Sequence, residues 1–209
     1  MLIVPIVEGH GEVEAVPILI RRISDALQIS RPDIASPIRI SRNKIVRNGK
    51  VEKAELERVF QLAYLKLREP GAILLLLDGN SDCPAKLGPQ LLSTMQSIRP
   101  DIAVSAVLAK KEYEAWFLAA LASLRGKRGI SSSAVLSSDP EAMTGAKERL
   151  ESFMQDRSYS ETLDQPALTD QFDLDQALKN SPSFDKFWRE LKIILSGDSG
   201  QGIKSSRRD

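Results

Sequence analysis

The run Ala72-Ile-Leu-Leu-Leu-Leu-Asp78 constrains the fold more than any other part of the sequence. A continuous apolar run of this length, ending in an acid, is typical of a strand that is buried on both faces in a parallel sheet. Leu2 to Val7 has the same character and is followed by Glu8. We therefore predict two buried parallel strands, each with a carboxylate at its carboxyl end.

Helical and strand patterns alternate along the first 124 residues. Apolar residues recur at helical spacing over 12–27, and we expect that helix to begin near Pro17, since proline is tolerated in a first turn. A strand is predicted over 38–46, with an Asn48-Gly49 turn after it. The remaining predicted elements are helices over 51–67, 87–98 and 112–124 and a strand over 102–109. This order predicts an α/β fold with a mostly parallel sheet flanked by helices.

The sequence changes character after Leu124. A basic, glycine-rich segment, Arg125-Gly-Lys-Arg-Gly, is followed by serine-rich residues, and helical patterning resumes near Glu141 without a convincing strand. We predict an α/β domain over 1–124, a helical extension over 125–195 that packs on it, and a flexible polar tail over 196–209.

Composition excludes several classes of protein. The formal net charge is +1, so any surface that binds an anion must be local. Cys83 is the only cysteine, which excludes an intrachain disulfide and favours a reducing compartment. The first residues lack the features of a signal peptide, and no apolar run approaches the roughly 18 residues of a membrane span. These features predict a cytoplasmic protein that does not enter a membrane.

Acids follow three of the predicted strands. Glu8 follows the first, Asp78 and Asp82 follow the strand at 72–78, and Glu112 and Glu114 follow the strand at 102–109. Ligands of open parallel sheets bind at the carboxyl ends of the strands. Hard divalent cations such as Mg²⁺ prefer a few carboxylate oxygens and keep several waters. A metal site at this edge is therefore one interpretation, and acids that merely face solvent at strand ends are the other.

Three residues near the predicted site are candidate phosphate contacts. His10 lies between two glycines and suits phosphate binding or proton transfer, although a loop histidine that is merely exposed fits the sequence equally well. Lys111 and Lys86 are candidates to contact the phosphate of a substrate. The alternative is that both are ordinary solvated lysines. The basic loop at 125–128 and the Arg207-Arg208 pair are further candidates for nucleic-acid contact.

Five segments, in order along nearly the whole chain, give the sequence a resemblance to a known family. They are Val7-Glu-Gly-His-Gly-Glu-Val-Glu-Ala, Leu77-Asp-Gly-Asn-Ser-Asp-Cys-Pro-Ala-Lys-Leu-Gly-Pro, Lys111-Glu-Tyr-Glu-Ala-Trp-Phe-Leu-Ala, Tyr159-Ser-Glu-Thr-Leu-Asp-Gln-Pro-Ala-Leu-Thr and Ser183-Phe-Asp-Lys-Phe. The chain resembles the Toprim domain of topoisomerases, primases and OLD-type nucleases. It is more similar to small bacterial Toprim-like proteins, some of which are nuclease effectors in phage defence.

The resemblance implies a Toprim metal site for Mg²⁺ or Mn²⁺. It places the family's glutamate at Glu8 and the second acid of the OLD-like variant at Glu12, and these two residues with Asp78 are the implied catalytic residues. The family's Asp-x-Asp loop maps onto Asp78 and the positions after it. The sequence departs from that motif because Asn80 stands where the second aspartate is expected.

The implied metal ligands extend beyond the catalytic residues. Glu8, Asp78 and Asp82 are the expected core ligands, the Asn80 carbonyl is a neutral ligand, and Glu112 supports the site or holds a second ion. His10, Lys111 and Lys86 remain the candidate substrate contacts.

The function that these features favour is a Mg²⁺-dependent nuclease that cleaves phosphodiester bonds in DNA or RNA. Two alternatives stay open: a non-catalytic subunit that uses the Toprim fold as a scaffold on an ATPase, and a metal-dependent phosphotransfer enzyme that acts on a small molecule. Nucleic acid, an ATPase of the OLD or ABC type and a second copy of the chain are the expected partners.

Overall fold

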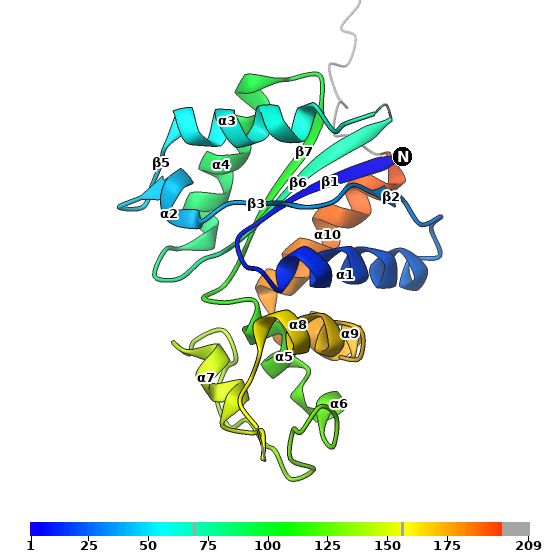
Figure 1. The fold of residues 1–209 in the computed structure, drawn as a ribbon, viewed down its shortest axis with the longest axis vertical. Helices are drawn as coiled ribbons and strands as arrows, with labels where there is room; N and C mark the ends of the chain where they lie inside the picture. Colours follow the sequence, from blue (N-terminus) through cyan, green and yellow to red (C-terminus); the bar gives the residue numbers. More distant parts are fainter. Residues whose placement is uncertain (69, 156, 198–209) are drawn as a thin grey trace, which may run out of the picture.

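A parallel sheet forms the centre of the protein, of which the computed structural model describes residues 1–68, 70–155 and 157–197. Strands β1 (Leu2–Val7), β6 (Gly71–Asp78) and β7 (Ala103–Ala109) lie parallel, side by side. Two short strands, β2 (Asp33–Ile34) and β3 (Ile38–Arg39), both pair with β1, giving the order β2-β1-β6-β7 (Figure 1). The prediction of an α/β fold with a mostly parallel sheet is confirmed.

Helices cover both faces of this sheet because side chains along a strand point alternately to its two faces. Ile3, Val7 and Leu74 belong to one hydrophobic cluster, which includes residues of α1 (Glu12–Ala26) and α10 (Pro182–Ser196). Val4 and Leu75 belong to a second cluster, with residues of α3 (Lys53–Tyr64) and α4 (Pro84–Ile98). Burial on both faces explains why β1 and β6 are continuous apolar runs.

The region between α1 and α3 differs from the prediction. The expected strand over 38–46 is a strand only at β3, and α2 (Arg42–Ile45) follows it. Strands β4 (Val46–Arg47) and β5 (Lys50–Val51) then form an antiparallel hairpin. Its turn residues, Asn48 and Gly49, have φ values of 52° and 69°, which is the left-handed conformation expected of an Asn-Gly turn. The polar residues at 42–44 interrupt the alternation on which the strand prediction rested.

Three helix boundaries also differ from the prediction. Helix α1 begins at Glu12, so Pro17 lies inside it rather than at its start. Helix α4 begins at Pro84, where proline suits the first turn. The helix predicted over 112–124 is divided at Ala120, with a φ of −112°, into α5 (Glu114–Ala119) and α6 (Leu121–Leu124).

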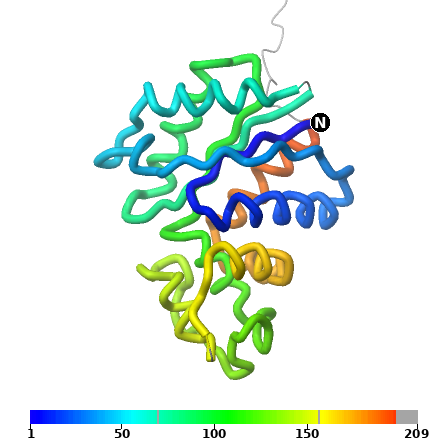
Figure 2. Tube along the Cα trace, viewed as in Figure 1, coloured from blue at the N-terminus to red at the C-terminus, as the bar shows by residue number. Residues whose placement is uncertain are grey.

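The residues after Leu124 share a core with the sheet. They form α7 (Ala146–Glu151), α8 (Glu161–Thr169), α9 (Leu174–Asn180) and α10. Helix α8 packs on α1, and α10 packs on β7 and α1. Figure 2 shows α8 and α9 on the side of α1 that faces away from the sheet. A single hydrophobic cluster extends from Ile3 to Ile194, so the predicted extension is joined to the sheet by continuous apolar contact.

An aromatic group fills this shared core. Trp116 and Phe117 are fully buried. The Trp116 ring lies 5.3 Å from the rings of Phe184 and Phe187 in α10.

Among the described residues, no helix is both long and apolar enough to cross a bilayer. Most of the predicted tail, including Arg207-Arg208, lies outside the described residues.

Gly11 lies where α8 crosses the start of α1, and its substitution tests that contact. A Cβ atom at Gly11 would lie 2.2 Å from Gln165 Oε1 and 2.3 Å from the Glu161 carbonyl oxygen. We expect Gly11→Ala to lower the free energy of unfolding by about 1–3 kcal/mol, because backbone must move to relieve the overlap. Urea unfolding would measure this. Gly88→Ala is the control: its Cβ would meet its nearest neighbour at 3.5 Å, so stability should stay level or rise. Equal stability of both variants would contradict the prediction.

Candidate functional site

The loops after β1 and β6 leave the sheet toward opposite faces. The chain after β1 enters α1, which covers one face, and the chain after β6 enters α4, which covers the other. Such a divergence between neighbouring parallel strands opens the crevice in which α/β proteins bind ligands. Glu8 follows β1 and Asp78 ends β6, so both carboxylates lie at this crevice, and both side chains are partly exposed.

Glu8 contributes a carboxylate oxygen without a partner. Its Oε2 atom is buried and accepts no hydrogen bond from any described residue. Burial raises the pKa of Glu8, while backbone hydrogen bonds from Arg42 and Asp78 and the charge of Arg42 partly oppose this effect. A buried carboxylate oxygen without a donor is costly unless a proton or a cation binds it.

Glu12 lies directly behind Glu8. It is the first residue of α1 and is 2% exposed, and its Oε2 accepts a hydrogen bond from the Glu8 backbone amide at 2.9 Å. Burial, followed by repulsion from Glu114 and Glu8, raises the pKa of Glu12 to about 8. Glu12 therefore fixes the turn after β1, and its burial favours the protonated form.

Asp78 joins the ends of β6 and β7. Its Oδ1 accepts a hydrogen bond from the Tyr113 backbone amide at 2.9 Å. Burial and then the charges of Glu12, Glu114 and Glu8 raise the pKa of Asp78 well above its ordinary value. The predicted site residues Glu8, Glu12 and Asp78 are thus brought together.

Glu114 completes the group, which we call the carboxylate cluster: Glu8, Glu12, Asp78 and Glu114. Glu114 is the first residue of α5 and is 4% exposed, and its Oε1 accepts hydrogen bonds from Tyr159 Oη at 2.9 Å and Gln165 Nε2 at 3.4 Å. Burial raises its pKa to about 7, with smaller contributions from Glu112 and Glu161. Sequence reasoning noted Glu114 after the strand at 102–109 but assigned the site role to Glu112.

Glu112 lies at the margin of the cluster. Its Oε2 accepts a hydrogen bond from the Lys147 backbone amide at 2.9 Å, at the start of α7. Lys147 Nζ forms an ion pair with Glu161 at 2.5 Å. Glu112 therefore has a structural partner in the helical part of the chain and a weaker claim to a ligand role than Glu114.

Asp82, an expected core ligand, is placed differently. It forms an ion pair with Arg42 of α2, whose side chain is 8% exposed. Asp82 is absent from the charges that raise the pKa values of Glu8, Glu12 and Asp78. The structure thus pairs Asp82 with the buried Arg42, whose charge also acts on Glu8 and partly opposes the rise in the Glu8 pKa.

The remaining predicted site residues lie on the rim. His10, Asn80 and Lys86 are exposed and Lys111 is partly exposed. Asn80 and Lys111 have φ values of 49° and 71°, and the Asn80 amide donates to the Lys111 carbonyl at 2.9 Å. These four residues lie in loops or first turns at the carboxyl ends of the strands, where a ligand of the cluster would meet them.

The basic loop after α6 is engaged within the protein. Arg128 forms an ion pair with buried Asp164, and Arg125 Nε donates to the Ala134 carbonyl at 2.7 Å. Arg157 also pairs with Asp164. These contacts order the loop and weaken the interpretation of its arginines as free phosphate contacts.

The cluster fits a hard cation only in part. Among the described residues, no group of three or more His, Cys, Asp and Glu side chains is arranged to hold a metal ion together. Mg²⁺, however, is usually bound by one or two carboxylates and several waters. Glu8 and Asp78, which are partly exposed, match such a set, and the unpartnered Glu8 oxygen is a ligand atom of the kind that Mg²⁺ prefers.

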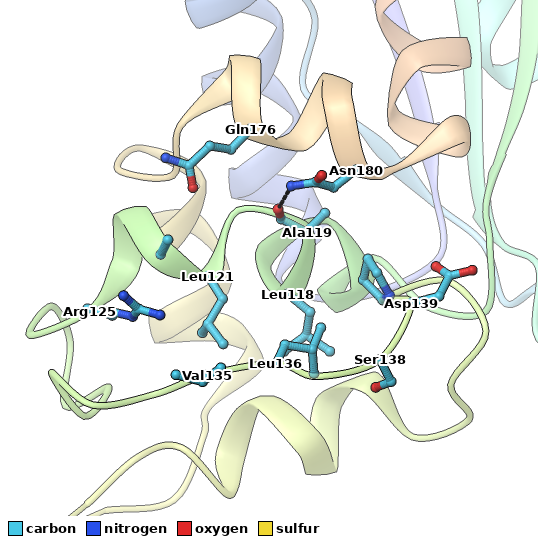
Figure 3. A pocket seen from close by; sticks show the side chains of 12 residues that line it. Leu118, Ala119, Leu121, Arg125, Val135, Leu136, Ser138, Asp139, Gln176 and Asn180 are labelled. Atoms are coloured by element: carbon cyan, nitrogen blue, oxygen red, sulfur yellow. Dashed lines mark hydrogen bonds between the residues drawn. The ribbon is translucent and has the colours of Figure 1, made fainter.

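A separate pocket of about 470 Å³ lies away from the cluster, between α5, α6, α9 and the segment at 135–140 (Figure 3). Leu118, Leu121 and Leu136 give it apolar walls. Asn180 also lines it, but its amide Nδ2 donates to the Ala119 carbonyl at 2.8 Å. The pocket contains no carboxylate of the cluster, so it does not contribute to the candidate site.

The raised pKa values predict that stability falls with rising pH when no metal is present. In the unfolded chain Glu12 ionises near its ordinary pKa of 4.5, whereas in the folded protein its pKa is about 8. The folded state therefore binds more protons between these values, and the stabilisation is lost as pH rises through about 8. In EDTA, we expect wild type to lose at least about 1 kcal/mol between pH 5.5 and 8.5.

Two variants isolate this effect in thermal melts at both pH values. Glu12→Gln keeps a hydrogen-bond acceptor but removes the titrating carboxyl, so its stability should depend less on pH than that of wild type. Glu14→Gln changes an exposed acid two residues away and should retain the wild-type dependence. Equal pH dependence in wild type and Glu12→Gln would refute this account of the cluster.

Comparisons with known proteins give a family but no assigned activity. Among the curated proteins and the solved structures, none matches the chain. A family model described as a domain of unknown function, DUF4276, matches residues 7–192, which include the whole carboxylate cluster. Because this match covers most of the sequence, the chain belongs to the DUF4276 family.

Proposed function

We propose that the carboxylate cluster binds a divalent cation and that the protein is a nuclease that cleaves phosphodiester bonds in DNA or RNA. The observation that carries this proposal is the convergence of four carboxylates, all with raised pKa values, after three neighbouring strands. Displacing protons from such a group is what a divalent cation does when it binds carboxylates. The resemblance to Toprim proteins supports the same chemistry.

The residues of the cluster have distinct roles in this proposal. Glu8 and Asp78 are partly exposed and would hold the ion from two strand ends. Glu12 is buried and orients the Glu8 backbone, so it is a positioning residue. Bound Mg²⁺ or Mn²⁺ would supply Lewis-acid activation of the phosphate and of a water. His10, Lys111 and Lys86 on the rim would contact the phosphates of the nucleic acid.

A non-catalytic role is the second candidate, and two observations favour it. Asp82 is neutralised by Arg42, and Asn80 brings no charge, so the loop after β6 offers Asp78 as its free carboxylate. This leaves fewer charged ligands than the Toprim motif implies. In that case the protein would serve as a scaffold subunit of an OLD- or ABC-type ATPase, and the cluster would tune stability.

The central test is metal binding and cleavage by matched variants. Calorimetric titration of Mn²⁺ and Mg²⁺ should show saturable binding to wild type. The double variant Glu8→Gln, Asp78→Asn should bind at least about 10-fold more weakly, because both proposed ligands lose their charge. Asp101→Asn is the control, since Asp101 lies at the opposite end of the sheet and pairs with Arg99.

The same proteins should be assayed on single- and double-stranded DNA and RNA, with the native partner present. We expect Asp78→Asn to abolish metal-dependent cleavage while its melting temperature without metal stays level or rises, because a like charge is removed. The increase in melting temperature on adding metal should shrink. Metal binding without cleavage by wild type would favour the scaffold role, and absence of both would remove the metal site.

Asn80→Asp gives a gain-of-function test. The substitution adds a charge where the Toprim motif has its second aspartate, and we expect metal to bind about two- to fivefold more tightly, the effect of an exposed charge pair. Asn48→Asp is a matched control because Asn48 is also exposed and has a φ of 52°, but it lies in the β4–β5 turn. Unchanged affinity in Asn80→Asp would show that this loop lies outside the metal site.

A further inference from the structure

Strand β7 is an edge strand that lies in a groove. It pairs with β6 on one side, and no strand of the described residues pairs with it on the other. Ala106, Val107 and Leu108 line a cavity of about 580 Å³, yet they are only 5%, 2% and 3% exposed. The free edge of β7 is therefore recessed in the protein surface, in contrast to an ordinary exposed edge strand.

Every second residue of β7 points its backbone hydrogen-bonding groups into this groove. The Ala109 carbonyl accepts a bond from the Gly79 amide at the end of β6, so odd-numbered residues of β7 face β6. The Lys110 amide points the opposite way and donates to Ser183 Oγ at 3.1 Å. By the same alternation, the N–H and C=O groups of Ala106 and Leu108 face the groove.

The groove-facing N–H and C=O groups of Ala106 and Leu108 have no hydrogen-bond partner in the described part of the chain. The Lys110 amide, which also points away from β6, does have a partner, because the Ser183 side chain accepts its hydrogen bond. No hydrogen bond from another described element reaches the backbone of Ala106 or Leu108. Buried backbone groups of this kind are nearly always paired, either with protein or with water. The groove thus presents an unused row of strand hydrogen-bonding sites.

The walls of the groove are mostly apolar. Helix α4 contributes Ala85, Gly88 and Leu92, and α10 contributes Pro182 at its start. Alanine and glycine at the first two positions add little side-chain bulk to this wall. A segment of about five residues matches the length from Ala106 to Lys110, the part of the strand and its end that lines the groove, at about 3.3 Å per residue.

The charges on the groove are mostly positive. Lys110, Lys186 and Arg189 line it, and the one acid in its lining, Glu141, is 1% exposed and accepts a hydrogen bond from the Ser183 amide at 2.8 Å. Lys186 and Arg189 have acidic neighbours on α10, whereas Lys110 forms no ion pair within the described residues. Among the described residues, Lys110 is therefore the unpaired charge of the rim, and it favours an acidic side chain on a partner.

We propose that the groove along β7 binds an extended, acidic peptide segment of a partner protein, which adds a strand to the sheet. The unused backbone groups would supply the affinity, and the apolar walls and Lys110 would select alternating apolar and acidic side chains. The backbone row favours a peptide over a nucleic acid, because only a peptide continues the strand pairing. The recess between α4 and α10 favours a lone segment over a second copy of this sheet with its helices. This proposal is independent of the nuclease proposal.

The test uses defined synthetic peptides and the whole chain. The probe is a capped heptapeptide that alternates Glu and Val, and its backbone control has the same sequence with every second amide N-methylated, which blocks pairing along one edge. A third peptide alternates Lys and Val. Binding is measured by calorimetry, and amide hydrogen exchange is measured by NMR with and without peptide.

The proposal expects a pattern that side-chain binding alone would not produce. On adding the Glu-Val peptide, exchange should slow at the Ala106 and Leu108 amides and stay unchanged at Ser105 and Val107, whose amides face β6. The N-methylated and Lys-Val peptides should bind at least tenfold more weakly. Lys110→Glu should reverse the preference between the Glu and Lys peptides.

Two substitutions probe the groove without relying on one folded variant. Ala85→Trp places an indole from an exposed position of α4 into the groove and should abolish peptide binding, whereas Gln90→Trp, exposed on the same helix outside the groove, should not. Ala106→Pro removes the outward donor and should weaken binding at least tenfold. If that variant fails to fold, Ala85→Trp still decides.

Three results would overturn the proposal. The first is no saturable binding of the Glu-Val peptide, and the second is equal binding of its N-methylated form. The third is protection of Ala106 and Leu108 in the peptide-free protein together with a dimer in sedimentation, which would identify a second copy as the occupant.

Discussion

Crowding of carboxylates at one end of the sheet is the constraint on which the rest of the structure depends. Glu12 and Glu114 are almost fully buried, and each raises the pKa of Asp78. Such a group destabilises a fold unless hydrogen-bond donors surround it or protons neutralise it. The donors come from distant parts of the chain: the Glu8 and Tyr113 amides from the segments after β1 and β7, and Tyr159 and Gln165 from the helical region.

This dependence explains why the helical region cannot be a loose appendage. Tyr159 and Gln165 belong to the approach and body of α8, which packs against the start of α1. Gly11 is needed there because α8 crosses too close to α1 for any side chain. The same crossing that completes the apolar core also delivers two donors to Glu114. The fold and the candidate site therefore depend on the same contacts, so a change in α8 affects both.

Elements that depend on the spacing of apolar residues could be predicted from the sequence. Features that depend on contacts between distant residues could not. Strands β1, β6 and β7 were predictable because burial on both faces requires continuous apolar runs. Strand β2 was not predicted, and β3 was predicted only as part of a longer strand, since each makes two residue pairs with β1 and leaves little pattern. Glu8 and Asp78 were predictable from strand ends, and Glu12 only from the resemblance to Toprim proteins. The pairing of Asp82 with Arg42 joins residues 40 positions apart, and no local pattern reports it.

The segment that connects β7 to α5 links the two surfaces proposed to bind ligands. At one end the Lys110 amide is fixed by Ser183, which also accepts a hydrogen bond from Trp116 Nε1 at 2.8 Å. Three residues later the Tyr113 amide holds Asp78 at 2.9 Å. Trp116 in turn packs on the Tyr113 ring, with the two ring centroids 4.8 Å apart. The groove along β7 and the carboxylate cluster are thus joined by a short, buried and hydrogen-bonded path.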